Sequence, residues 1–384
     1  MTVVVVAGAL ANKAGSGGEA WIRTSWVRGF ARLGAEAWLV EEIDPAACTD
    51  AAGRRCRPAD SVQAAYFAEV VERFDLAERA LLRGRAGAGR AGDVLFGRAE
   101  DAARLAETAD LVVNVGGHLD ARALAPRATV AYLDIDPGWS QGWLAGDDAA
   151  RAGHDVFWTI AAHLGRPGCG LPTAGLPWRP VRQPVLLEDW PVTPMPDEAR
   201  ATTVATWRHP FGPPEGMDGA PGKHHEFRRI IDLPRRTPAA LELALAIDPG
   251  DDGDRDRLAA HGWAVRDART VAATPDDFRS YVQGSWAELS AAQGAYVHTG
   301  SGWFSDRSVR YLASGRPVVV QDTGLAGALP VGEGLLPFDD LDGAAGALSA
   351  VAADPTGHSQ AARALAERCF AAEVVLAPLL EEAA

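Results

Sequence analysis

The hydrophobic pattern at the start of the chain predicts strands alternating with helices. Val3–Ala7 is an unbroken, mostly β-branched run, which is typical of a buried parallel strand. An apolar stripe at helical spacing follows over 22–33, and Gly34 ends that predicted helix. Further strands are expected at Ala37–Val40, Leu111–Val115, Thr129–Leu133 and Val156–Ile160, and helices near Ser61–Phe74 and Ala99–Ala109. This alternation predicts a doubly wound parallel sheet.

A proline-rich stretch divides the pattern into two halves. Eight prolines lie between Pro167 and Pro196, too many for a regular core element. The alternation restarts at Thr202–Trp207, and further strands are expected at Leu241–Ile247, Ala264–Val265, Ala295–His298 and Pro317–Gln321. We therefore predict an α/β protein of two Rossmann-like, doubly wound parallel-sheet domains that face a cleft. The predicted domains are 1–195 and 196–365, and a C-terminal helix over 366–384 could cross back to the N-terminal domain.

Charge and cysteine content exclude several classes of protein. The chain has 37 basic and 51 acidic side chains and a net charge of −14, which argues against a protein that coats nucleic acid or an anionic membrane. Its 4 cysteines are scattered, without the spacing of a disulfide framework or a thiolate zinc site. The N-terminus lacks a basic signal-peptide region, and no apolar run is long enough to span a membrane. We expect a cytoplasmic protein without a transmembrane anchor.

The strongest local signal for function lies in the segment 296–324. A predicted strand runs into Gly300-Ser301-Gly302, a helix begins near Ser305, and a second buried strand follows Gly315. Small residues let backbone amides approach an anion, and a helix N-terminus adds partial positive charge. Ser and Arg side chains there can bind phosphate oxygens. The alternative is that Ser305 only caps the helix and Gly315 only ends it.

These residues resemble the donor site of GT-B glycosyltransferases. The small-residue turn, the helix and the run from Leu312 to Val320 are similar to the segment that holds the diphosphate and sugar of a nucleotide-sugar donor in family-1 and family-4 enzymes. Ala205-Thr206-Trp207, followed by Gly222-Lys223, is similar to the first C-terminal strand of these enzymes and its cation-bearing loop. The resemblance implies a C-terminal donor domain and an N-terminal acceptor domain.

The resemblance also implies an activity. We expect a metal-independent hexosyl- or deoxysugar transferase that uses a UDP-, dTDP- or GDP-linked sugar as co-substrate and has no permanently bound cofactor. The acceptor would be a hydroxyl or amine of a small molecule or glycan, in natural-product or glycan biosynthesis, and the protein a monomer or homodimer that binds no nucleic acid.

The chain departs from both catalytic patterns of the family. Gly302 and Arg310 occupy the positions of the paired glutamates of retaining enzymes, and His298 lies four residues before the histidine position of inverting enzymes. A catalytically inactive nucleotide-sugar binding or auxiliary protein, and a sugar-nucleotide epimerase of the same fold, therefore remain alternatives.

The candidate donor-side residues carry amides, hydroxyls, charges or hydrogen-bonding ends. They are Arg208, Lys223, His298, Gly300, Ser301, Gly302, Ser305, Asp306, Arg307, Ser308, Gln321 and Asp322. Lys223 is one of only two lysines among the 37 basic residues, and a point charge in its loop suits a diphosphate. Its alternative is a solvated surface lysine. Gln321 and Asp322 end the last strand and could bind sugar hydroxyls.

The N-terminal half offers three candidates for a general base: Glu19, His118 and Asp136. Gly17, Gly18 and Trp139 are the other acceptor-side candidates. Each candidate base has a structural alternative: Glu19 could complement a helix dipole, Asp136 could begin a turn, and His118 could be structural or exposed.

Two other functional interpretations of the N-terminal half are weaker. A nicotinamide site would use Glu41 or Glu42 as the ribose acid, but the glycine spacing of a dinucleotide fingerprint fails. The DxD of Asp134 and Asp136 is typical of metal-dependent transferases of another fold, yet such a pair is common. No metal site is therefore predicted.

Overall fold

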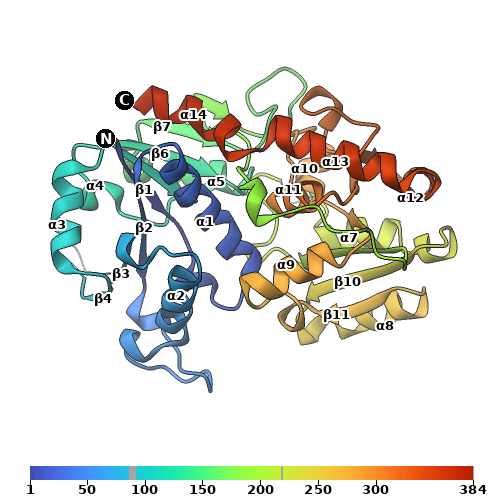
Figure 1. Ribbon diagram of the computed structural model, residues 1–384, viewed down its shortest axis with the longest axis horizontal. Coiled ribbons are helices and arrows are strands. Elements are labelled where there is room, and N and C mark those ends of the chain that lie inside the picture. The colour runs from blue at the N-terminus through green and yellow to red at the C-terminus, as the bar shows by residue number, and fades with distance from the viewer. Residues whose placement is uncertain (86–91, 218, 384) are drawn as a thin grey trace. The chain divides into compact units, whose positions relative to one another are not determined.

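The computed structural model describes residues 1–85, 92–217 and 219–383 (Figure 1). Its strands form two sheets, with the orders β4-β3-β2-β1-β5-β6-β7-β8 and β11-β10-β9-β12-β13-β14. β1 (Val3–Ala7) pairs in parallel with β2 on one side and β5 on the other. In the second sheet β9 (Arg200–Thr206) pairs in parallel with β10 and β12. These sheets, flanked by helices, confirm the predicted fold class.

The chain forms two compact units. The first consists of Met1–Ile135, Gly146–Trp158 and the chain from Ala372 onward; the second consists of Asp136–Ala145 and Thr159–Ala371. The predicted boundary at 195/196 falls inside the second unit, and as a domain boundary it stays a prediction.

The first unit holds most of the first sheet and its helices. Its further strands are β2 (Glu36–Ile43), β3 (Ala80–Gly84), β4 (Val94–Phe96), β5 (Leu111–Val115), β6 (Thr129–Asp134) and β7 (Val156–Thr159). Its helices are α1 (Gly17–Arg32), α2 (Val62–Arg73), α3 (Ala99–Thr108), α4 (Ala121–Leu124), α6 (Asp148–Ala152) and α14 (Ala372–Ala383). Buried Val5, Val40 and Val112 belong to the core that fills one face of this sheet.

Both ends of the chain belong to the first unit, because α14 packs against α1 (Figure 1). Gly29 of α1 lies so close to α14 that a Cβ at this position would be 2.5 Å from Leu376 Cδ1. The absence of a side chain at Gly29 therefore permits this close packing of helices.

The second unit contains the second sheet. Besides β9, its strands are β8 (Trp178–Pro180), β10 (Ala240–Ala246), β11 (Ala264–Asp267), β12 (Ala287–Ser290), β13 (Val318–Gln321) and β14 (Leu335–Phe338). Its helices are α5 (Trp139–Ala145), α7 (Lys223–Arg229), α8 (Asp252–Ala260), α9 (Pro275–Gln283), α10 (Gly294–His298), α11 (Asp306–Ala313), α12 (Leu341–Ala353) and α13 (Pro355–Cys369). Trp207, Phe227 and Leu289 belong to its core.

One predicted strand is wrong. The segment Ala295–His298 lies in the short helix α10, and the strand of this region is β12, Ala287–Ser290. β12 carries Glu288, a charged residue that interrupts the apolar pattern in the sequence but is fully buried in an ion pair. Across the described parts of the chain, no helix is both long and apolar enough to cross a membrane.

Candidate functional site

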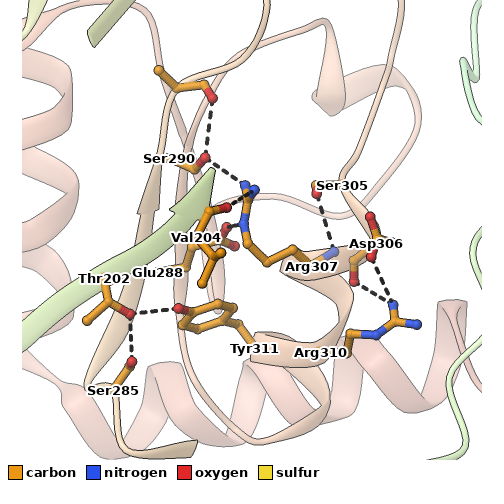
Figure 2. A network of polar contacts seen from close by, with 11 residues as sticks. Thr202, Val204, Ser285, Glu288, Ser290, Ser305, Asp306, Arg307, Arg310 and Tyr311 are labelled. Atoms are coloured by element: carbon orange, nitrogen blue, oxygen red, sulfur yellow. Dashed lines mark hydrogen bonds and ion pairs between the residues drawn. The ribbon is translucent and has the colours of Figure 1, made fainter. Parts of the chain in front are cut away.

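Arg307, which was predicted to bind phosphate, is buried in the second unit, where its side chain connects a helix to two strands. Its Nε donates to Glu288 Oε1 (2.6 Å), its Nη1 to the carbonyl oxygen of Val204 (2.8 Å) and its Nη2 to Ser290 Oγ (2.7 Å), as Figure 2 shows. The guanidinium thus joins α11 to β9 and β12. Each nitrogen of the guanidinium has an acceptor, so the protein holds Arg307 in place, and its positive charge acts on Lys223.

Lys223 is the predicted donor-side residue whose charge is least satisfied. It is the first residue of α7 and is 8% exposed, and its backbone N–H donates to Gln293 Oε1 (2.8 Å). Its ammonium forms no hydrogen bond or ion pair with any residue that the structure describes. Burial, and next the charge of Arg307, lower its pKa to about 7, against the opposing effect of Asp136 and other carboxylates. An anion bound beside the ammonium would offset the free-energy cost of burying its charge.

Arg208 is held by two partners in the loop after β9. Its Nε and Nη2 donate to the two oxygens of Asp251 (2.6 and 2.7 Å), and its Nη1 lies 2.8 Å from His224 Nε2. A guanidinium can only donate, so His224 Nε2 accepts and the ring carries its proton on Nδ1. Burial, followed by the charges of His225 and Arg208, lowers the pKa of His224 to about 4, so the ring is neutral at pH 7.

The amides expected to cradle an anion at Gly300–Gly302 are engaged within the protein. The N–H groups of Gly300, Ser301 and Gly302 donate to the carbonyl oxygens of Val297, Tyr296 and Thr323, at 3.2, 3.2 and 2.6 Å. Gly300 and Gly302 have φ of 57° and 68°, so glycine is favoured at both turns. In this structure these glycines shape the loop, and the three amides are not free to bind a phosphate.

At the start of α11, the hydroxyl of Ser308 has no hydrogen-bond partner in the described part of the chain. Ser305 Oγ accepts from the backbone N–H of Arg307 (3.3 Å), so it caps the helix, and the carbonyl oxygen of Asp306 accepts from Arg310 (2.7 Å). Ser308 is buried, and its Oγ has no hydrogen-bond partner among the described residues. A small pocket is lined by Ser305, Arg307 and Ser308, so Ser308 is the group here best able to bind a ligand oxygen.

Gln321 and His298 meet at a buried carboxylate. Gln321 Nε2 donates to Glu226 Oε2 (2.5 Å), and Gln321 Oε1 accepts from the backbone N–H of Ala292 (3.2 Å). His298 Nε2 lies 3.7 Å from Glu226 Oε1, and its side chain is 52% exposed. Asp322 accepts hydrogen bonds of 2.9 and 2.8 Å from N–H groups of the following turn. Gln321 and Asp322 therefore have structural partners, whereas His298 keeps an exposed edge.

Two residues that the sequence assigned to the acceptor side belong to the second unit. Asp136 Oδ1 lies 4.0 Å from His209 Nε2. The ring of Trp139 stacks on His209 with centroids 3.9 Å apart, and its Nε1 donates to the carbonyl oxygen of Gly212 (3.0 Å). Asp136 also contributes to the electrostatic environment of Lys223. Of the three candidate bases, Asp136 is the one in the same unit as Lys223.

In the first unit, Glu41 fixes the loop that follows β1. Its carboxylate accepts from the backbone N–H groups of Leu10, Ala11 and Asn12 and from Asn12 Nδ2, at 2.6–2.9 Å. Burial raises its pKa to about 7, against the effect of these hydrogen bonds. A dinucleotide ribose would have to compete with these donors, so the nicotinamide interpretation gains no support here.

Glu19 and His118 are electrostatically coupled in the first unit. Glu19 follows Gly17 and Gly18 in the first turn of α1 and forms an ion pair with buried Arg23. Desolvation raises the pKa of Glu19, but Arg23 and other cations overcome it, and the pKa is lowered. Desolvation and the charge of Arg23 lower the pKa of His118 to about 4. Glu19 is thus an ion-paired carboxylate and His118 a neutral imidazole at pH 7.

Within residues 1–85, 92–217 and 219–383, no three histidine, cysteine, aspartate or glutamate side chains form a group that could hold a metal ion.

Comparisons with known proteins bear on the fold. No protein-family model matches the sequence, and no curated protein matches it significantly. Among solved structures, the Anabaena protein HepE in complex with UDP and glucose is similar over 100% of this chain and 99% of its own, with a TM-score of 0.58 and 12% identity. The chain has the GT-B fold.

Two further structures agree with the GT-B fold. AviGT4, a glycosyltransferase involved in avilamycin A biosynthesis, has a TM-score of 0.53 and 15% identity over 100% of this chain and 97% of its own. The sucrose-phosphate synthase of Thermosynechococcus elongatus has a TM-score of 0.51 and 12% identity over 100% and 98%. At these identities the likeness concerns the fold alone.

Sequence reasoning missed several residues of the second unit. Glu288 pairs with Arg307, Gln293 accepts from the backbone N–H of Lys223, and His209 contacts Asp136 and Trp139. None of the three belongs to a motif. Only the charge of Glu288 within an otherwise buried strand could have indicated a buried partner.

Proposed function

We propose that the protein is a glycosyltransferase that moves a sugar from a nucleotide-diphosphate donor to a hydroxyl or amine acceptor. The observation that carries this proposal is the buried ammonium of Lys223, which has no partner among the described residues and lies near Arg307 in the second unit of a GT-B fold. Buried cations without a counterion are costly, and the diphosphate of a nucleotide sugar is a suitable counterion. The neighbours solved with UDP or with UDP and glucose support a nucleotide ligand.

The chemistry would divide between a leaving group and a base. The bond between the anomeric carbon and the diphosphate oxygen breaks, the acceptor oxygen or nitrogen bonds to that carbon, and the acceptor proton goes to a base. Lys223 would offset the charge that develops on the departing diphosphate. Asp136 is our candidate base, because it lies in the same unit as Lys223 and affects its pKa.

Nucleotide binding by Lys223 variants tests the donor site. We expect UDP, dTDP or GDP to raise the melting temperature of the protein, and Lys223→Ala to weaken binding of the preferred nucleotide about tenfold or more, as expected for loss of a charge-assisted contact worth about 1.5–3 kcal/mol. Lys13→Ala is the matched control, because Lys13 is the other lysine and lies in the first unit. If all three nucleotides leave the melting temperature unchanged, the donor site is refuted.

Product analysis then distinguishes the alternatives. With donor and an acceptor panel, a transferase releases nucleoside diphosphate together with a glycosylated product. An epimerase of the same fold converts the donor without an acceptor, and an inactive binding protein retains the nucleotide without turnover. Asp136→Asn should lower kcat at least a hundredfold while changing the nucleotide Kd less than threefold, consistent with loss of a general base.

A further inference from the structure

A second, larger pocket lies within the second unit. It has a volume of about 460 Å³, in the range of pockets that bind small molecules. Its walls come from the start of α5, the glycine- and proline-rich loop after β9, and the starts of α7 and α10. Gly222, which lines the pocket, directly precedes Lys223, so the pocket adjoins the residue that we propose binds the diphosphate.

The loop and α5 are packed closely enough to make this wall preformed. A Cβ on Gly138 would lie 3.1 Å from Pro214 Cγ, and a Cβ on Gly142 would lie 3.2 Å from Glu215 Cβ. Gly138 has φ of 93°, a conformation that glycine adopts readily. Because Gly138 and Gly142 lack side chains, the backbone at α5 can approach the loop at Pro214 and Glu215.

Aromatic rings continue from the pocket wall to the surface. Trp139 stacks on His209, both residues line the pocket, and His209 lies 5.6 Å from the ring of Phe211. Phe211 in turn packs edge-on against Trp143 at 5.2 Å, and the two rings are 63% and 44% exposed. Large exposed aromatic side chains beside a pocket are typical of ligand-binding surfaces rather than of solvated loops.

Two side-chain N–H groups of the pocket lining have no acceptor among the described residues. Gln293 is 5% exposed; its Oε1 accepts from Lys223, while its Nε2 has no partner among the described residues. His224 Nδ1, which carries the proton because Arg208 occupies Nε2, is likewise buried without an acceptor in the described chain. No aspartate or glutamate is among the described residues that line the pocket.

We propose that this pocket binds the acceptor, and that the acceptor is a planar aromatic compound bearing a phenolic hydroxyl, with or without a carboxylate. The ring would lie against Trp139 and His209, which line the pocket, with Phe211 next to His209, and its oxygen would accept from Gln293 and His224. The described residues of the lining include no carboxylate side chain that could accept from the several hydroxyls of a carbohydrate. This proposal rests on the proposed transferase function, whose nucleotide site is tested separately.

The test measures binding of 1-naphthol, 1-naphthoate and methyl glucoside to the full-length protein by ligand-observed NMR titration. We expect the two aromatic probes to bind and the glucoside not to bind. Phe211→Ala should weaken both aromatic probes at least fivefold and leave the UDP Kd within twofold. Val192→Ala is the matched control, because Val192 is another half-exposed apolar residue of the second unit. This variant should leave the Kd values of both aromatic probes and of UDP unchanged.

A second variant tests the polar end of the pocket. Gln293→Glu keeps the acceptor for the Lys223 amide but replaces the free NH₂ with a carboxylate oxygen. We expect the affinity for 1-naphthoate to fall at least tenfold and the affinity for 1-naphthol to fall less.

The proposal is overturned if neither aromatic probe binds, if Phe211→Ala binds them as well as the unmodified protein does, or if methyl glucoside binds in a Phe211-dependent manner. Failure of UDP to bind, with aromatic binding intact, would instead refute the nucleotide site and leave the pocket assignment standing.

Discussion

At the scale of single residues, Glu41 shows that an acid near the end of a strand need not bind a ligand. Glu41→Gln replaces one carboxylate oxygen with an NH₂ that faces backbone N–H groups, so at least one donor loses its acceptor. We expect the free energy of unfolding to fall by about 2–4 kcal/mol, the cost of one or two unsatisfied buried donors. Urea denaturation measures the loss, with exposed Glu72→Gln as a control expected to change stability by less than about 0.5 kcal/mol.

Lys223 predicts a pH dependence of nucleotide binding. Burial lowers its pKa to about 7, so in the free protein the amine is mostly neutral above that pH, whereas a bound diphosphate favours the ammonium. Binding at pH 8.5 should therefore take up about one proton, and affinity should fall by up to about tenfold per pH unit above 7. Calorimetry in buffers of different ionisation enthalpy measures the uptake. Lys223→Ala should abolish it, and uptake that persists in this variant would contradict the assignment.

The sequence predicted which residues lie near the proposed site better than it predicted which partners their side chains bind. The sequence placed Lys223, Arg208 and Arg307 near the proposed site, but it could not show that Asp251 and Glu288 already neutralise the two arginines. Those partners lie 43 and 19 residues away along the chain, and no local pattern records such pairings. Lys223 differs because no carboxylate reaches its ammonium in the described chain.

At the scale of elements, the Arg307 fork should determine how α11 is fixed to the sheet. A lysine at this position cannot reach Glu288, Val204 and Ser290 together, because it lacks the planar fork. Arg307→Lys should destabilise the protein by about 3 kcal/mol, since it leaves a buried carboxylate poorly compensated. The exposed pair of Arg235 and Asp232 provides the control: Arg235→Lys should change stability by less than about 1 kcal/mol. Equal losses in the two variants would contradict a structural role of the fork.

Apolar strands were predicted well, whereas the strand that carries the partner of Arg307 was missed. β1, β5 and β13 are apolar runs and were predicted to within one residue, as were the ends of α3. β12 was missed because Glu288 interrupts its pattern, and the β-favouring residues of α10 suggested a strand in its place. Edge strands β4 and β8 have only three residues each, too few for a periodic signal.

At the scale of the whole molecule, the two units do not correspond to two continuous halves of the sequence. The segment Asp136–Ala145 belongs to the second unit, and α14 returns to the first. Pattern analysis detects a strand or helix from neighbouring residues, but the sheet or helix against which a segment packs is decided by tertiary contacts. The predicted acceptor residue Trp139 and base Asp136 therefore lie in the unit that carries Lys223.

The return of α14 to α1 makes stability of the first unit depend on the last residues of the chain. Leu376 is fully buried against Gly29, so Leu376→Ala should lower the free energy of unfolding by about 2–4 kcal/mol through the cavity that it leaves. Val374→Ala, an exposed position in the same helix, should cost less than about 0.5 kcal/mol. The UDP Kd should stay within twofold in both variants, because Lys223 and Arg307 belong to the other unit. Urea denaturation and UDP titration measure the two effects, and a Leu376→Ala protein that keeps full stability but loses UDP binding would contradict this separation of roles.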